Sequence, residues 1–242
     1  MTVLYASGRK GIKCPSALLI KDYQMQCSSR ELLKCKVLHL ENFLPVPTVS
    51  QSILKKAVEL NVHVLVVGLI GHGGPHVCPM GTTATELLAQ TVSTPILLVP
   101  NSIVMQSLPG ALIPSRVFLL AAQLSEKTLR CLNTTLDMMH TTDTLHILYL
   151  SPPEWSPEAD ATFRQLFDTQ LACSQITYTV TLQPSSPHAT IGEQLQSASE
   201  LYKADYLIVG KSTKTGDGNN IQNNSVLSTL FNSPRCSILV CP

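Results

Sequence analysis

Glycines and threonines with the spacing of an anion-binding loop follow one apolar run of the sequence. Gly68 ends the run, Gly71 stands three positions later, and Gly81, Thr82 and Thr83 come after nine further residues. Glycine lets a backbone approach a ligand closely, and the free N–H groups at a helix N-terminus attract anions. Threonine hydroxyls there can cap the helix and bond phosphate oxygens. The pattern therefore predicts a phosphate-binding loop formed by these five residues.

A strand and a helix must position this loop. The β-branched apolar residues over 62–68 indicate a buried strand. The pattern over 82–92 indicates a helix that buries Leu87, Leu88 and Val92. Both loop ends would then be held by regular structure.

The segment that contains the loop recurs later in the chain. Residues 62–68 align with 204–210, and residues 94–100 align with 236–242 at the same spacing of 142 residues. A repeat of this length indicates two versions of one structural unit. We refer to residues 1–100 as the first repeat and residues 115–242 as the second repeat.

The second repeat has the pattern of a complete α/β domain. Strands are expected near 116–122, 145–150, 175–182, 205–210 and 237–241, with helical patterns between them. In the first repeat, residues 3–7 match the second of these strands, so the first strand and first helix have no counterpart. We expect two doubly wound parallel-sheet domains, at 1–100 and 115–242, joined by a linker over 101–114 that contains Pro109, Gly110 and Pro114.

The loop pattern and the repeat together resemble the universal stress protein family. Nucleotide-binding members of that family carry G-x2-G-x9-G-[ST] after their fourth strand, and Gly68, Gly71, Gly81 and Thr82 match it without a gap. The resemblance implies a Rossmann-like nucleotide-binding α/β fold, repeated in tandem. It also implies a stress-response regulatory protein that binds ATP, with any Mg²⁺ arriving with the nucleotide. Family dimers associate through the last strand, so residues 96–99 and 237–241 are expected to pair or pack in an internal pseudo-dimer.

The sequence departs from the family pattern at other positions. ATP-binding members hold the adenosine with an aspartate at the end of their first strand, a strand that the first repeat lacks. In the second repeat Gln123 stands at that position. The second glycine motif keeps Gly210, while Thr213, Asn223 and Asn224 replace the rest. Nucleotide binding is therefore expected in the first repeat only.

Other residues with chemical potential have simpler interpretations. Gly210-Lys211-Ser212-Thr213 looks like the end of a P-loop, but Asp205 stands where the first glycine of that motif is needed. Lys211 is therefore expected to be a solvated loop residue. The stretch 72–75 has the sequence of an esterase oxyanion loop, but no G-x-S-x-G nucleophile motif accompanies it.

Two further features bear on metals and on helix ends. His72, His76 and Cys78 are candidate zinc ligands, but no fourth ligand is evident nearby, so no metal site is predicted. Ser125, followed by Glu126, is expected to cap a helix. With no activated nucleophile or general base in evidence, we do not expect an enzyme.

Composition limits the classes of partner. The 242 residues include 17 Lys+Arg and 16 Asp+Glu, so the net charge of +1 argues against nucleic-acid binding. No apolar run is long enough to span a membrane, and the start does not resemble a signal peptide. The eight cysteines are irregularly spaced, which favours reduced, mostly buried thiols in the cytoplasm.

The resemblance and the departures from it leave three functions open at this point. The first is ATP binding without catalysis. The second is an interaction scaffold that has lost nucleotide binding, and the third is the cytosolic regulatory part of a membrane transporter. A homodimer is a further expectation, and the protein partner is not specified by the sequence.

Overall fold

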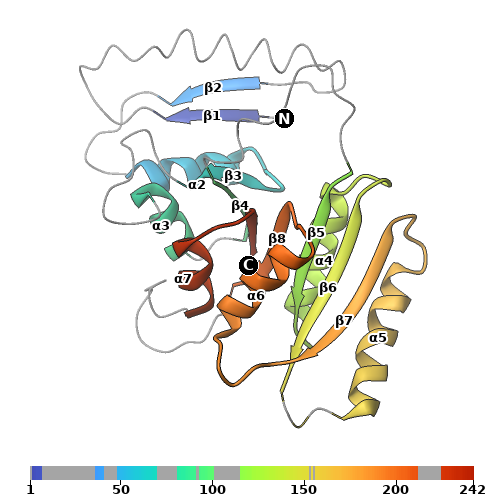
Figure 1. The fold of residues 1–242 in the computed structure, drawn as a ribbon. Helices are drawn as coiled ribbons and strands as arrows, with labels where there is room; N and C mark the ends of the chain where they lie inside the picture. Colours follow the sequence, from blue (N-terminus) through green and yellow to red (C-terminus); the bar gives the residue numbers. More distant parts are fainter. Residues whose placement is uncertain are drawn as a thin grey trace. The chain divides into compact units, whose positions relative to one another are not determined.

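The computed structural model describes residues 2–6, 36–40, 48–69, 81–90, 93–100, 115–152, 154, 156–211 and 225–242 (Figure 1). The chain forms two units, Met1–Asn61 and Val62–Pro242. No helix among these residues is long and apolar enough to cross a bilayer.

The described residues of the first unit form β1 (Thr2–Ala6), β2 (Lys36–Leu40) and α2 (Val49–Glu59). β1 and β2 pair in parallel, from Thr2 opposite Lys36 to Ala6 opposite Leu40. β2 was not predicted, because its K-V-L-H-L pattern is short and only partly alternating. α2 begins with a capping box in which the side chains of Thr48 and Gln51 bond each other's backbone N–H.

The second unit contains one seven-stranded sheet and its helices. Its elements are β3 (Leu65–Gly68), α3 (Thr82–Ala89), β4 (Ile96–Val99), β5 (Val117–Ala122), α4 (Glu126–Met138), β6 (Thr144–Ser151), α5 (Pro157–Leu171), β7 (Thr177–Pro184), α6 (Ile191–Leu201), β8 (Tyr206–Gly210), α7 (Ser225–Asn232) and β9 (Ser237–Cys241). The strand order is β3-β4-β9-β8-β5-β6-β7. The strands of the second repeat thus follow a doubly wound order, with β5 in the middle.

All neighbouring strands in this sheet are parallel except β4 and β9. These two run antiparallel, with Ile96 opposite Val240, Leu97 opposite Leu239 and Leu98 opposite Ile238. The expectation that residues 96–99 and 237–241 pair is therefore confirmed. Because the sheet takes strands from both repeats, the domain boundaries at 100 and 115 stay a prediction, and the linker 101–114 lies outside the described residues.

The predicted strands of the second repeat are confirmed, with ends displaced by at most two residues. One face of the sheet forms the main core. Phe118, Leu120 and Ile147 are fully buried on this face, together with Cys131 and Leu132 of α4. α5 adds Phe163, Phe167 and Leu171 to the same core. The long runs of apolar residues in these strands are what a parallel sheet covered on both faces requires.

Two helix ends differ from their predicted form. α3 ends at Ala89 rather than near residue 92, because the backbone of Gln90 is extended (ψ 146°). Ser125 occupies the N-cap position of α4, but its side chain makes no capping hydrogen bond. Instead the Thr128 hydroxyl accepts a hydrogen bond from the backbone N–H of Gln123 at 2.9 Å, so the predicted role of Ser125 is wrong.

A buried carboxylate joins the start of β5 to the turn before β6. Asp143 is 1% exposed and accepts hydrogen bonds from the backbone N–H of Arg116 (2.8 Å), the guanidinium of Arg116 (2.7 Å) and the backbone N–H of His140 (2.8 Å). Burial by itself raises the pKa of Asp143, but the hydrogen bonds from Arg116 and His140 outweigh it, so the pKa is lowered.

Replacing this carboxylate tests its contribution to stability. For Asp143→Ala we expect the free energy of unfolding at pH 7 to fall by about 3 kcal/mol, because the substitution removes the acceptor of the backbone N–H groups of Arg116 and His140 and breaks the ion pair with the Arg116 guanidinium. Since the folded-state pKa is lowered, the stabilisation is fully present above about pH 4 and is lost as the pH falls through the folded pKa. The difference between wild type and variant in urea titrations should therefore shrink below pH 4. Asp137→Ala, at an exposed carboxylate, should change stability by less than about 0.5 kcal/mol.

Candidate functional site

The end of β3 and the start of α3 are held together by backbone hydrogen bonds. The N–H of Leu69 donates to the carbonyl of Val99 at 2.9 Å, and the N–H of Gly81 donates to the carbonyl of Leu69 at 2.8 Å. Leu69 is 2% exposed and Gly68 pairs with Val99 as the last residue of β3. The chain therefore leaves the sheet at Leu69 and returns beside it at Gly81, which brings Gly68, Gly81 and Thr82 to one end of the strand.

The first turn of α3 is free of a side-chain cap. Gly81 is the N-cap residue, in extended backbone conformation (φ −64°, ψ 151°), and makes no side-chain capping bond. Thr82 is therefore the first helical residue rather than the cap, which corrects the expectation that the Thr82 and Thr83 hydroxyls cap the helix. Thr82 is exposed and Thr83 is half-buried, while the hydroxyl of Thr85 donates to the carbonyl of Gly81 at 3.1 Å.

This arrangement suits an anion. A helix N-terminus carries a partial positive charge and unpaired N–H donors, and no described side chain supplies the acceptor at α3. Of the five residues that the sequence predicts for the loop, the structure brings Gly68, Gly81, Thr82 and Thr83 to one end of β3 and α3. Gly71 lies outside the described residues, as do His72, His76 and Cys78.

The corresponding strand end in the second repeat is built differently. Lys211 occupies the position of Leu69, and its N–H donates to the carbonyl of Cys241 at 2.7 Å, as that of Leu69 does to Val99. Its ammonium group donates to the carbonyl of Gln90, the C-cap residue of α3, at 2.8 Å. Lys211 is half-buried and burial lowers its pKa, so the prediction of a solvated loop residue is wrong. Ser212 and Thr213 lie outside the described residues.

The strand order places a topological switch point between β5 and β8. In doubly wound sheets, ligands bind at the carboxyl ends of the two strands that flank such a point. Gln123 is exposed at the end of β5, and the ammonium group of Lys127 donates to the carbonyl of Lys211 at 3.3 Å, just beyond β8. Neither residue supplies the carboxylate that adenosine recognition in the family would need. The second repeat thus has the switch point without the expected polar anchor.

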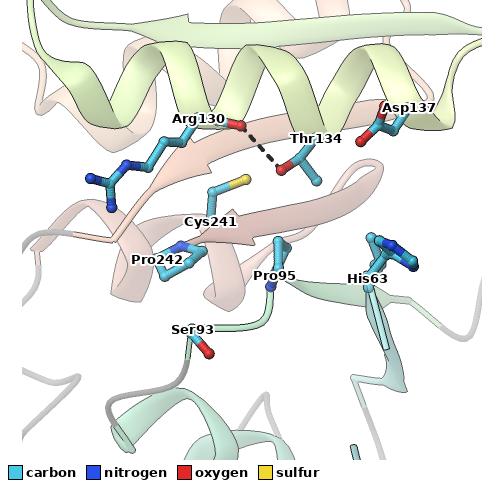
Figure 2. Close-up of a pocket in the computed structure, with 9 residues that line it drawn as sticks. His63, Ser93, Pro95, Arg130, Thr134, Asp137, Cys241 and Pro242 are labelled. Atoms are coloured by element: carbon cyan, nitrogen blue, oxygen red, sulfur yellow. Dashed lines mark hydrogen bonds between the residues drawn. The ribbon is translucent and has the colours of Figure 1, made fainter. Parts of the chain in front are cut away.

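A cavity of about 290 Å³ lies elsewhere on the same unit, between the start of β3, the approach to β4, α4 and the end of β9 (Figure 2). It is lined by His63, Val64, Ser93, Pro95, Arg130, Thr134, Asp137, Cys241 and Pro242. The Thr134 hydroxyl donates to the carbonyl of Arg130 at 3.1 Å, as the dashed line in Figure 2 marks. This cavity could not be predicted from the sequence, because its lining residues are far apart in the chain and match no motif.

The thiol in this cavity is not an activated nucleophile. Cys241 is 1% exposed, and its hydrogen bond with Cys131, together with burial, raises its pKa well above the ordinary value. Cys131, Cys236 and Cys241 are free and buried, and Cys173 is free and exposed. Burial is therefore confirmed for three of these four thiols, and their reduced state stays a prediction.

The contact between Lys211 and Gln90 links β8 to the C-terminus of α3 and can be tested. For Lys211→Met we expect the free energy of unfolding at pH 7 to fall by about 1.5 kcal/mol, because a charged donor to the helix C-terminus is lost. Chemical denaturation would measure the change. Lys203→Met removes an exposed ammonium group and serves as the matched control, with an expected change below about 0.5 kcal/mol. Equal effects of the two substitutions would contradict a specific role for Lys211.

No protein-family model and no curated protein matches the sequence. Solved structures do match it. A functionally unknown protein from Pseudomonas aeruginosa PAO1 is 12% identical with a TM-score of 0.64, over 99% of this chain and 81% of that chain. A universal stress protein from Archaeoglobus fulgidus is 17% identical with a TM-score of 0.58, over 99% of this chain and 84% of that chain. The chain therefore shares the α/β fold of a universal stress protein structure.

Proposed function

We propose that the chain is a regulatory protein of the universal stress type that binds ATP at the β3–α3 loop. The observation that carries this proposal is the closure of the loop by the hydrogen bond from Gly81 to Leu69, beside a helix N-terminus without a side-chain cap. The shared fold supports it, since the loop pattern stands after the strand at which the family carries it.

The phosphates would lie against the first turn of α3. The backbone N–H groups of that turn and the hydroxyl of Thr82 would donate to phosphate oxygens, and Thr83 would line the same end. Hydrogen bonds to a charged group are worth about 1.5–3 kcal/mol each, and the helix dipole adds about 0.3–1 kcal/mol. Gly68 and Gly71 would leave room for the backbone to approach the phosphates. Any Mg²⁺ would be bound mainly through the phosphates.

We propose binding at the first repeat only. In the second repeat, the ammonium group of Lys211 is already directed to the carbonyl of Gln90, and Gln123 replaces the carboxylate expected for adenosine. We further propose that the bound nucleotide is a regulatory ligand and is not hydrolysed. Among the residues that the structure describes at this loop, Gly68, Leu69, Gly81, Thr82 and Thr83 carry no side chain that could act as a general base. If the protein does not bind ATP, two functions remain: an interaction scaffold, or the regulatory part of a membrane transporter.

A negative charge at the N-cap of α3 would weaken nucleotide binding without lowering the stability of the protein. In Gly81→Asp the carboxylate would cap α3 and oppose phosphate at the same place. The backbone angles of Gly81 are accessible to any residue, so we expect the free energy of unfolding to stay equal or to rise by about 0.5 kcal/mol. ATP affinity, measured by calorimetric titration, should fall at least about tenfold through like-charge repulsion and loss of the free donors.

The control is Gly210, which is the counterpart of Gly68 in the second repeat. A Cβ at Gly210 would lie 3.7 Å from the Sγ of Cys131, an ordinary contact, so Gly210→Ala should fold and bind ATP as the wild type does. Assays for released phosphate should remain at the background rate for all three proteins. Wild-type protein that fails to bind millimolar ATP would exclude the proposed function, and equal affinity in Gly81→Asp would move the site away from α3.

A further inference from the structure

Two buried thiols from different elements meet in the main core of the sheet. Cys131 lies in α4 and Cys241 is the last residue of β9, and each is a free cysteine with 1% of its surface exposed. A hydrogen bond joins their side chains. Both belong to the same core cluster. The fold thus brings together two cysteines that are 110 positions apart in the chain.

A glycine leaves room for this contact. Gly210 pairs with Cys241 in the parallel ladder of β8 and β9, so the two residues share one face of the sheet. The Sγ of Cys131 lies 3.7 Å from the position that a Cβ would take at Gly210. Cys131 therefore lies over the glycine, beside the side chain of the glycine's ladder partner. Because α4 packs against both β8 and β9, regular structure holds the two thiols together.

The two thiols differ in how readily they lose a proton. The hydrogen bond that Cys241 donates lowers the pKa of Cys131, and the charge of Lys127 lowers it further. The same hydrogen bond, together with burial, raises the pKa of Cys241. The thiolate is the nucleophilic form of cysteine. Cys131 is therefore the attacking thiol of the pair, and Cys241 is the thiol that stands ready to react with its product.

The cavity described above leads to this pair. It borders Cys241, whose side chain is directed toward α4 in Figure 2. It also borders Arg130 and Thr134, which flank Cys131 along α4. A cavity of about 290 Å³ has room for a molecule that is little larger than water, such as hydrogen peroxide. A small oxidant can therefore reach thiols that larger reagents cannot.

We propose that Cys131 and Cys241 form a redox-active dithiol that hydrogen peroxide oxidises to an intramolecular disulfide. The Cys131 thiolate attacks a peroxide oxygen and the O–O bond breaks, which gives a sulfenic acid and a hydroxide ion. The hydroxide takes the proton of Cys241 and becomes water. The Cys241 thiolate then attacks the sulfur of the sulfenic acid. An S–S bond forms, the S–O bond breaks, and the leaving hydroxide takes up the proton that Cys131 released on ionising. The two sulfurs lose two electrons in total, and the peroxide is reduced to two water molecules.

The disulfide would join α4 to the strand that connects the two repeats. β9 pairs with β4 of the first repeat, and α4 follows β5 of the second. A cross-link between residues so far apart in the chain strongly restricts the unfolded state. The oxidised protein should therefore be more stable than the reduced one. This proposal does not depend on nucleotide binding, since neither thiol belongs to the β3–α3 loop.

Peroxide treatment of the reduced full chain tests the proposal. Peptide mass spectrometry, after the remaining thiols are alkylated in denaturant, should find the link between residues 131 and 241 as the main disulfide. The melting temperature should rise by about 5 °C or more. Cys131→Ala should abolish both effects. Cys236→Ala is the matched control, since Cys236 is also free and buried, and burial raises its pKa to about 11. It should form the link as the wild type does.

The same treatment of wild-type protein in urea gives a second measurement that requires no variant to fold. The yield of the 131–241 link should be at least about tenfold lower there, because only the fold brings the two sulfurs together. A link that forms in folded wild type and in Cys236→Ala, but not in urea, supports the proposal. No link at a peroxide concentration that oxidises the exposed Cys173, or an equal yield in urea, overturns it. A link that lowers the melting temperature would show that the bond requires a distorted fold, and would also overturn it.

Discussion

The antiparallel pairing of β4 with β9 is the constraint on which the second unit depends. Each of these strands ends its own repeat, and each would otherwise be an apolar edge open to aggregation. Pairing Leu97 with Leu239 and Leu98 with Ile238 buries both edges and makes one sheet from two repeats. Among the described residues, β3 is then the end strand of this sheet and pairs with β4.

The β3–α3 loop follows from this sheet. β4 supplies the Val99 carbonyl that fixes Leu69, and Leu69 in turn fixes Gly81 at the start of α3. The C-terminus of the same helix is held by Lys211 of the second repeat, through the carbonyl of Gln90. The two ends of α3 are therefore held by different repeats. This places an uncapped helix N-terminus, the basis of the proposed phosphate site, at a fixed position beside the sheet.

Doubly wound folds usually combine a switch point and a glycine loop in one domain, whereas here each repeat has one of the two. The second repeat has a central strand and a switch point between β5 and β8, but Gln123 and Lys211 occupy the places of a carboxylate and a loop residue. The first repeat has the loop, while its β3 ends the sheet among the described residues. The two repeats therefore differ in burial at equivalent positions: Val66 is exposed, whereas Ile208 is fully buried.

The α/β class and the strands of the second repeat could be predicted from the amino-acid sequence, because they depend on apolar patterns and repetition in consecutive residues. The pairing of the closing strands could be predicted only through the resemblance to the universal stress protein family. The helix cap at Gly81 became evident only once the exact start of α3 was known. The contact of Lys211 with Gln90, the pair of Asp143 and Arg116, and the cavity beside Cys241 all join residues distant in the chain. They could not be predicted, because a side chain's partner there depends on which strands become neighbours.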